Sequence, residues 1–450
     1  MKQLNTLSLV LLSSAVLMQS CKPEFDEVTP DKGNLNAAKY VAIGNSITAG
    51  YADNGLYYKG QQVSYANLLA EQLKLVGGGE FKMPYVPETS VGVGGSLNAP
   101  LKLGYSTDCR GITGLAPVPV AASGDINIFL NSIAANGPYN CVGVPGARAV
   151  EVVFPGFGNP ANGPGLFNPF FTRFTDDPAN SSMMSYAAAQ NPTFFSLFIG
   201  NNDVLGYALS GGTTGAVTPS AGQPGVGFDA SIDLVVNTMT ANGAQGVIGN
   251  VPDITSIPYF TTVPWNGLTL DATSAAQLTA AYAALGITFT AGANGFIIED
   301  AAAPAGFRQI QQGELVLLSV PQDSLKCAGW GSTRPIPDRF VLDAGEIAPI
   351  NAAVAAYNVK LRNVADAKGL AFVDVNAFLG AARTSIVYNG VEVTTTFVSG
   401  GGFSLDGVHL TPRGNALLCN EFIKAINLKY NSTIPQVDAT KYTGVVFPAN

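Results

Sequence analysis

The sequence predicts an α/β fold in which helices cover both faces of a central parallel sheet. Segments with the apolar pattern of strands alternate along the chain with segments of helical spacing, which is typical of such sheets. The continuous apolar run at residues 194–199 has the pattern of a strand buried on both faces. Hydrophobic residues make up 47% of the chain and charged residues only 12%, so a large core is expected.

The predicted elements can be given in chain order. Strands are expected at residues 38–43, 194–199, 246–250, 295–298 and 370–375, with a further strand end or turn at 140–147. Helices are expected at residues 65–75, 230–241, 273–285, 343–368 and 415–429, and residues 148–151 are also competent to form one. The sequence contains no internal repeat. We expect residues 37–450 to form one domain around this framework.

Long stretches rich in Gly, Pro, Ser and Asn interrupt the framework. They lie around residues 77–138, 154–190, 206–227 and 257–340, and their composition is typical of loops that contain only short strands. The segment at 257–340 departs furthest from the alternation of strands and helices. We expect that segment to form a lid or a subdomain.

The N-terminus has the pattern of an export signal. Lys2 precedes an apolar run at residues 7–18 that is too short to span a bilayer, and Ser20 stands directly before Cys21. This arrangement resembles a bacterial lipoprotein signal peptide, which implies removal of residues 1–20 and lipidation of Cys21. An ordinary secretory signal and a buried helix are the alternatives.

Residues 21–36 are expected to form a tether between the lipid and the domain, because they are polar, charged and contain two prolines. The short acidic stretch after Cys21 is similar to the surface-export tags on lipoproteins of the Bacteroidota. The chain is therefore expected in the cell envelope, anchored to the outer membrane through Cys21 and exposed at the cell surface. Its net charge of −8 and pI near 4.7 argue against a surface that binds nucleic acid.

Four further cysteines remain once Cys21 is set aside, namely Cys109, Cys141, Cys327 and Cys419. An even number in an oxidising compartment is compatible with two disulfides, which can connect in three ways. Four free buried thiols are the equal alternative, because cysteine behaves as a small hydrophobic residue. A zinc site is disfavoured, because no two of these cysteines are close in sequence.

His409 is the only histidine of the chain, so any proton transfer through an imidazole must involve it. Asp406 stands three residues earlier, and the apolar helical run that follows places the pair on a loop at a helix N-terminus. In a turn, the Asp406 carboxylate can reach Nδ1–H, fix the tautomer and stabilise the imidazolium. The alternative is an acid at a helix N-terminus beside a packed histidine.

A serine and two candidate hydrogen-bond donors stand at other predicted junctions. Ser46 directly follows the first strand, and Gly44 and Gly50 leave room for a tight turn and for close approach of a substrate. Gly146 and Asn202 each follow an apolar strand, where a backbone N–H and a side-chain amide can point at an oxyanion. Each residue also has a structural explanation, since serine is a common N-cap and glycine and asparagine are common in turns.

Together these positions resemble the four blocks of the SGNH subgroup of the GDSL hydrolases. The matching segments, in block order, are Gly44-Asn45-Ser46-Ile47, Val144-Pro145-Gly146-Ala147, Gly200-Asn201-Asn202-Asp203 and Asp406-Gly407-Val408-His409. The first block departs from the family pattern, because Asn45 and Ile47 replace the Asp and Leu of the family name. The resemblance implies a flavodoxin-like three-layer α/β/α sandwich with a central parallel sheet and long loop insertions.

The resemblance also implies a role for each matching residue. Ser46 is the expected nucleophile, and His409 is the expected general base, oriented by Asp406. The N–H groups of Ser46 and Gly146 and the side chain of Asn202 are expected to form the oxyanion hole. The resemblance implies neither a cofactor nor a metal.

The expected function is a serine esterase that hydrolyses carboxylic esters through an acyl-enzyme on Ser46. The substrate class stays open between lipids and acetylated glycans, because apolar surroundings suit an acyl chain and aromatic loops suit a sugar. One alternative is a non-catalytic, surface-exposed lipoprotein that binds a glycan or polymer on the same fold. Another is a transacylase that uses the same residues.

Overall fold

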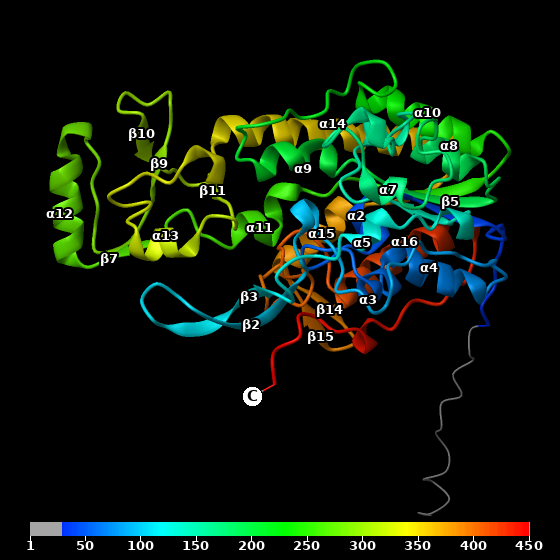
Figure 1. Cartoon of the computed structure of the whole chain (residues 1–450), viewed down its shortest axis with the longest axis horizontal. Helices are drawn as coiled ribbons and strands as arrows, with labels where there is room; N and C mark the ends of the chain where they lie inside the picture. The colour runs from blue at the N-terminus through cyan, green and yellow to red at the C-terminus, as the bar shows by residue number, and fades with distance from the viewer. Residues whose placement is uncertain (1–28, 450) are drawn as a thin grey trace, which may run out of the picture.

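A parallel sheet of five strands forms the centre of the computed structural model, which describes residues 29–449 (Figure 1). The strands are β1 (Tyr40–Gly44), β4 (Cys141–Gly143), β5 (Phe194–Phe198), β6 (Gln245–Gly249) and β13 (Ala371–Val373), in the order β13-β6-β5-β1-β4. Numbered along the chain, this order is the 2-1-3-4-5 arrangement of flavodoxin-like sheets. The predicted fold class, which is also the one that the SGNH resemblance implied, is therefore confirmed.

Helices cover both faces of the sheet because successive strand residues point to opposite sides. Val41 and Ile43 belong to the core of one face, and Tyr40 and Ala42 belong to the core of the other. The first face is covered by α6 (Ala149–Val152), α8 (Met183–Ala188), α9 (Asn202–Leu209), α10 (Phe228–Thr240) and α14 (Ala344–Lys368). The second face is covered by α4 (Tyr65–Lys74) and α16 (Pro412–Tyr430).

The ends of the long helices follow from their capping residues. Helix α14 begins after Asp343, which forms a capping box with Glu346, and ends at Gly369, whose φ of 64° is left-handed. Helix α16 begins at Pro412, three residues before the predicted start at 415, because Thr411 caps the helix and proline is favourable at its first position. This early start places the preceding loop directly at the helix N-terminus.

Shorter elements complete the part of the domain around the sheet. The helices are α2 (Ser46–Ala49), α3 (Tyr58–Gln62), α5 (Asn127–Leu130), α7 (Pro169–Thr172) and α15 (Val375–Thr384). Strands β14 (Ile386–Tyr388) and β15 (Val391–Val393) form one hairpin, and β2 (Leu101–Thr107) and β3 (Thr113–Pro119) form a longer one that projects from the domain (Figure 1).

Residues 258–342 form a separate group of elements, here called the outer unit. Most of it lies at the end of the molecule away from the sheet, whereas its first helix lies near α15 (Figure 1). Its elements are α11 (Pro258–Thr261), β7 (Leu268–Leu270), α12 (Ala272–Tyr282), β8 (Gly292–Asn294), β9 (Ile297–Glu299), β10 (Phe307–Gln309), β11 (Leu315–Val316), α13 (Gln322–Cys327) and β12 (Val341–Leu342). The outer unit has hydrophobic clusters of its own, which include Phe296, Ile298 and Ile310. Its strands pair only in twos, and none of them joins the central sheet.

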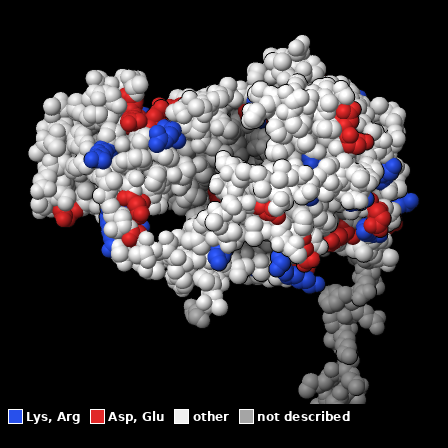
Figure 2. All heavy atoms as spheres, in the orientation of Figure 1, with Lys and Arg blue, Asp and Glu red and all other residues white. Residues whose placement is uncertain are grey.

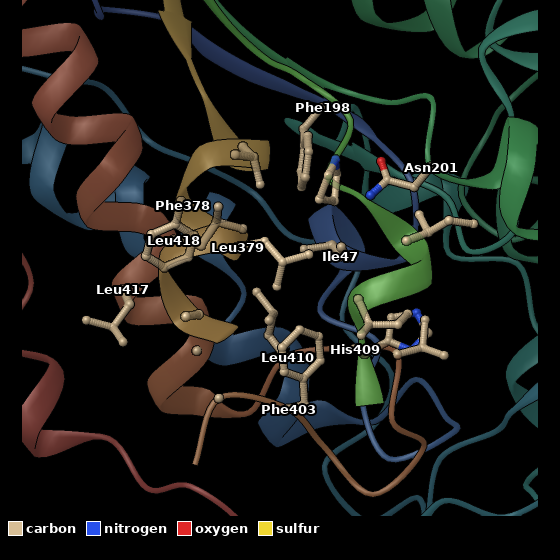
Figure 3. Close-up of a pocket in the computed structure, with 18 of the residues that line it drawn as sticks. Ile47, Phe198, Asn201, Phe378, Leu379, Phe403, His409, Leu410, Leu417 and Leu418 are labelled. Atoms are coloured by element: carbon tan, nitrogen blue, oxygen red, sulfur yellow. The ribbon is translucent and has the colours of Figure 1, made fainter. Parts of the chain in front are cut away.

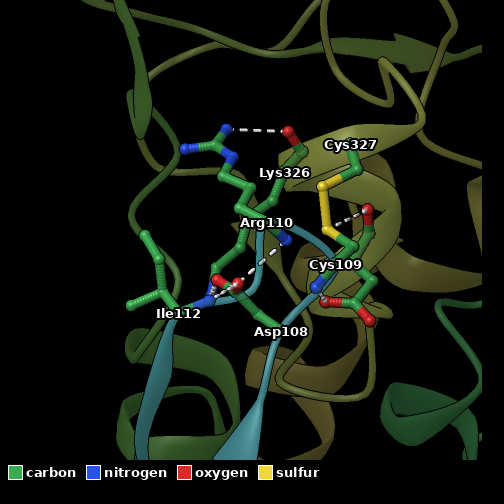
Figure 4. The surroundings of a disulfide bond; sticks show 7 residues. Asp108, Cys109, Arg110, Ile112, Lys326 and Cys327 are labelled. Atoms are coloured by element: carbon green, nitrogen blue, oxygen red, sulfur yellow. Dashed lines mark hydrogen bonds and ion pairs between the residues drawn. A yellow bond between two sulfur atoms is a disulfide. The ribbon is translucent and has the colours of Figure 1, made fainter.

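A disulfide between Cys109 and Cys327 joins the β2–β3 hairpin to α13 of the outer unit (Figure 4). An ion pair of 3.1 Å between Asp108 and Lys326 lies beside it. The bond closes a loop of 218 residues, and disulfides of this kind stabilise a fold by about 2–4 kcal/mol. The other two cysteines that the sequence offered, Cys141 and Cys419, are free and buried. Each of the two alternatives for the cysteines therefore holds for one pair.

A wide groove lies between the hairpin, the outer unit and the main body, where Figure 2 shows a gap in the surface. The groove is lined by Leu115 of the hairpin, by Phe296 of the outer unit and by Asp406 of the main body. Charged side chains are sparse on the face shown in Figure 2, in keeping with the low charged fraction of the chain. No helix within residues 29–449 is long and apolar enough to cross a membrane. The predicted signal peptide and Cys21 lie outside the described residues.

Candidate active site

Ser46 stands in a tight turn between β1 and α2. The side chain of Asn45 accepts a hydrogen bond of 3.1 Å from the Ile47 N–H and so caps the short helix. Its amide donates to Asn201 over 3.3 Å, so asparagine holds this turn by hydrogen bonds without a carboxylate. Gly44 is required for close packing, because a Cβ there would lie 2.1 Å from Thr48 Oγ1 and 2.6 Å from the carbonyl oxygen of Phe198.

The loop that carries His409 lies between β15 and α16 and faces this turn. The loop is closed by a hydrogen bond of 2.8 Å from the Ser404 N–H to the carbonyl of His409. Nε2 of His409 lies 2.8 Å from Oγ of Ser46, and Nδ1 lies 2.8 Å from Oδ2 of Asp406. The three residues thus form one chain of hydrogen bonds, although Ser46 and His409 are 363 positions apart in the sequence.

The Asp406 carboxylate is held by several donors besides the imidazole. Oδ1 accepts from the N–H groups of Val408 and His409, each over 2.8 Å, and from Ser404 Oγ over 3.0 Å. Oδ2 also accepts from the N–H of Asn54 over 2.8 Å. Burial opposes ionisation, but the neighbouring His409 and these hydrogen bonds outweigh it and hold the pKa of Asp406 below its usual range. The carboxylate is therefore ionised and keeps the Nδ1–H tautomer in place.

The two N–H groups proposed for an oxyanion hole lie at neighbouring strand ends. In the sheet, Gly44 pairs with Gly143 of β4 on one side and with Phe198 of β5 on the other. Gly146 follows β4 with a left-handed φ of 82° and is exposed. Within residues 29–449, the N–H groups of Ser46 and Gly146 have no hydrogen-bond acceptor. Both groups are therefore available to an oxyanion.

Asn202 is the first residue of α9 and lines the same pocket as Ser46 and His409. Its Nδ2 donates a hydrogen bond of 2.9 Å to the carbonyl of Ala147, which holds the side chain toward the second block. An asparagine amide carries two hydrogens, so one donor remains for a ligand. The adjacent Asp203 is buried and accepts from the Ala149 N–H over 2.8 Å, an arrangement that ties the third block to α6.

An apolar pocket opens beside Ser46 and His409 (Figure 3). Its empty volume is about 860 Å³ when its open mouth is included. Figure 3 shows the side chains of Ile47, Phe378 and Leu410 between α16 and the imidazole. Most of the other lining residues are apolar as well. Those from α15, β14, β15 and α16 include Leu379, Ala382, Ile386, Val393, Leu417 and Leu418.

Sequence reasoning missed the segment that follows the serine turn. The ring of Tyr51 packs against the imidazole of His409, with centroids 4.7 Å apart and an angle of 47° between the planes. Burial raises the pKa of the Tyr51 phenol to about 12, so it is uncharged near neutral pH. The sequence Asp53-Asn54-Gly55 is a turn signal that predicts a bend here. It gives no indication that the bend would contact a loop some 350 residues later.

The part of the chain that the structure describes contains no group of three or more His, Cys, Asp or Glu side chains arranged to hold a metal ion.

Replacing Asp406 by Asn is expected to destabilise the fold more at pH 7 than at pH 3. Because the pKa of Asp406 is lower in the folded chain than its usual value of about 3.9, its ionised form stabilises the fold above that value. The contribution is lost as the pH falls toward the folded pKa. Urea titration of both proteins at the two pH values measures the difference. An equal loss of stability at both would contradict the lowered pKa.

No protein-family model and no curated protein matches the sequence. Among solved structures, the chain is similar to an extracellular lipase from Streptomyces rimosus, with 14% identity over 86% of this chain and 100% of that chain and a TM-score of 0.34. It is also similar to a putative GDSL-like lipase from Parabacteroides merdae ATCC 43184, with 13% identity over 89% and 100% of the two chains and a TM-score of 0.34.

Proposed function

We propose that this chain is a serine esterase. The observation that carries the proposal is the hydrogen-bonded chain from Ser46 Oγ through both ring nitrogens of His409 to the Asp406 carboxylate, with 2.8 Å at each step. A serine hydroxyl beside a neutral imidazole that is oriented by a carboxylate is the arrangement that activates serine as a nucleophile. The two unpaired N–H groups beside it support acyl transfer, which passes through an oxyanion.

In the proposed mechanism, Ser46 Oγ attacks the carbonyl carbon of the ester and His409 Nε2 takes the hydroxyl proton. The negative oxygen is stabilised by the N–H groups of Ser46 and Gly146 and by the Asn202 amide. His409 then gives its proton to the departing alcohol, which leaves an acyl group on Ser46. Water attacks that acyl group while His409 takes one of its protons. His409 then returns this proton to Ser46 Oγ as the bond between Oγ and the acyl carbon breaks, and the carboxylic acid is released. Asp406 keeps its charge throughout and stabilises the imidazolium.

We propose further that the acyl group of the substrate occupies the apolar pocket. The pocket begins at Ser46 and His409, and apolar side chains form nearly all of its wall. An acetyl group would leave most of this apolar surface exposed to water. A longer acyl chain would cover it, and each methylene that is buried makes the binding free energy more favourable by about 0.8 kcal/mol. The pocket therefore favours lipid-like esters over acetylated glycans, the two substrate classes that composition left open.

We also propose that the enzyme is a lipoprotein of the outer membrane, held at the cell surface through Cys21. The support is the sequence of residues 1–36, most of which lies outside the described structure. In cells given a labelled fatty acid, the wild type is expected to incorporate label and to partition with membranes. Replacing Cys21 by Ala is expected to abolish both, with the other four cysteines serving as an internal control. Label that persists in the Cys21→Ala protein would contradict the anchor.

Replacing Ser46 by Ala is expected to lower kcat for ester hydrolysis by about 10⁴- to 10⁶-fold, because the nucleophile is lost. A fluorophosphonate probe is expected to label the wild type and not this variant. Ser123→Ala, which alters an exposed serine, is the matched control and should label normally. A wild-type protein that stays unlabelled and inactive would favour the non-catalytic binding lipoprotein instead.

The pocket predicts a dependence on acyl length. For a series of p-nitrophenyl esters from acetyl to octanoyl, kcat/KM is expected to rise by about fourfold for each methylene that enters the pocket. Ala382→Leu fills part of the pocket and is expected to lower kcat/KM for octanoyl but not for acetyl esters. Ala381→Leu, an exposed neighbour on the same helix, is the matched control.

A kcat/KM that falls from the acetyl ester onward would contradict acyl binding in this pocket and favour acetylated substrates. Product analysis with added alcohols would reveal a transacylase, because the acyl group would then be found on the alcohol.

A further inference from the structure

Residues 52–55 form a tight turn that lies against the loop of His409. The ends of the turn exchange two hydrogen bonds, from Ala52 N–H to the Gly55 carbonyl over 3.0 Å and from Gly55 N–H to the Ala52 carbonyl over 2.9 Å. Asp53 and Asn54 both adopt left-handed conformations, with φ of 51° and 62°. Two consecutive positive φ values are typical of a type I′ turn, which Asp and Asn tolerate better than most residues.

Asp53 contacts the loop through its backbone and its side chain. Its N–H donates to Ser404 Oγ over 3.0 Å, and its Oδ1 accepts from the N–H of Leu405 over 3.0 Å. Its Oδ2 accepts from the hydroxyl of Tyr57 over 2.7 Å, which fixes the carboxylate from the other side. Both oxygens of the carboxyl group therefore accept a hydrogen bond from a neutral donor, a pattern that an ionised carboxylate can satisfy.

The same turn also holds Asp406 directly. The N–H of Asn54 donates to Asp406 Oδ2, the oxygen that also accepts from His409 Nδ1. Ser404 Oγ accepts from Asp53 and donates to Asp406 Oδ1 over 3.0 Å. A shift of the turn would therefore move the carboxylate that orients the imidazole.

Besides Asp406, the carboxylate of Asp53 interacts electrostatically with the imidazole of His409. Asp406 is on the loop of His409 itself, Tyr51 and Asp53 are on the segment after α2, and Ser46 is on α2. Tyr57 faces Asp53 as a neutral donor. Burial, together with the charge of Asp406, raises the pKa of Asp53 above its usual value, although the bonds from Leu405 and Tyr57 and the charge of His409 offset part of this rise. Asp53 thus acts on His409 in two ways, through its charge and through the hydrogen bonds that hold the loop of His409.

We propose that Asp53 is a positioning residue for the proton relay. Its carboxylate holds the loop that carries Asp406 and His409, and its negative charge favours the protonated imidazole that forms when Ser46 attacks. The catalytic part of this inference rests on the proposed esterase function, whereas the coupling between Asp53 and His409 is a property of the fold alone. Asp53 lies outside the four segments that resemble the family blocks.

Asp53→Asn keeps the shape of the side chain and removes its charge. We expect kcat/KM for ester hydrolysis to fall by about 10- to 100-fold, since small displacements of catalytic groups have effects of this size. We also expect the acid limb of kcat/KM against pH to move to lower pH, because the imidazolium loses a nearby negative charge. Tyr57→Phe, which keeps the carboxylate and removes one of its donors, should have a smaller effect on both. Asp125→Asn, which alters a carboxylate that holds a different turn, is the matched control.

The histidine signal in a proton NMR titration tests the coupling without any substrate. Because the chain has one histidine, its resonance needs no assignment by mutation. We expect its titration midpoint to lie at lower pH in Asp53→Asn than in the wild type and to be unchanged in Asp125→Asn. If the wild type fails to hydrolyse esters, the proposed function fails, but a shifted midpoint still supports the coupling. An unshifted midpoint in folded Asp53→Asn, or lower activity that only follows a lower Tm, would overturn the inference.

Discussion

The Asp406 carboxylate is the contact on which the arrangement of this site depends. Its Oδ1 accepts three hydrogen bonds and its Oδ2 two, and these bonds join the loop of His409 to the turn at 52–55. A buried carboxylate is costly unless donors surround it, so the donors and the charge stabilise one another. The imidazole is the one donor of this set that also reaches Ser46. The orientation of the imidazole is thus a property of the whole set of contacts.

The sheet serves to bring the remaining groups to the same place. Because β1 lies between β4 and β5, the segments after these three strands emerge side by side at the carboxyl edge. The loop 404–409 then separates two spaces of different character. The apolar pocket lies on the side of Val408 and His409, and the wide groove reaches Leu405 and Asp406 on the other side. The disulfide between the β2–β3 hairpin and α13 closes that groove at its far end.

The sequence was sufficient for the framework and for the residues now found together at Ser46, Asp406 and His409. An apolar run such as residues 194–199 indicates a buried strand from its own residues alone. A helix cap such as Asp343 is likewise recognised from residues no more than three positions away. The role of Asp53 was not predictable, because its partners at 404 and 405 are about 350 residues away and backbone donors leave no trace in the sequence. The pairing of Cys109 with Cys327 was likewise undecided, since it depends on how the outer unit packs against the hairpin.

Trapping the acyl-enzyme shows whether Ser46 is the nucleophile. The protein is mixed with a p-nitrophenyl ester, and the reaction is quenched in acid during the first turnovers. The protein is then digested, and the masses of its peptides are measured by mass spectrometry. The mechanism predicts one acyl group on the peptide that contains Ser46, and none on that peptide in Ser46→Ala. The mechanism would be contradicted if the acyl group were found on another residue. It would also be contradicted if esters were hydrolysed while Ser46 stayed unmodified in samples quenched during the first turnovers.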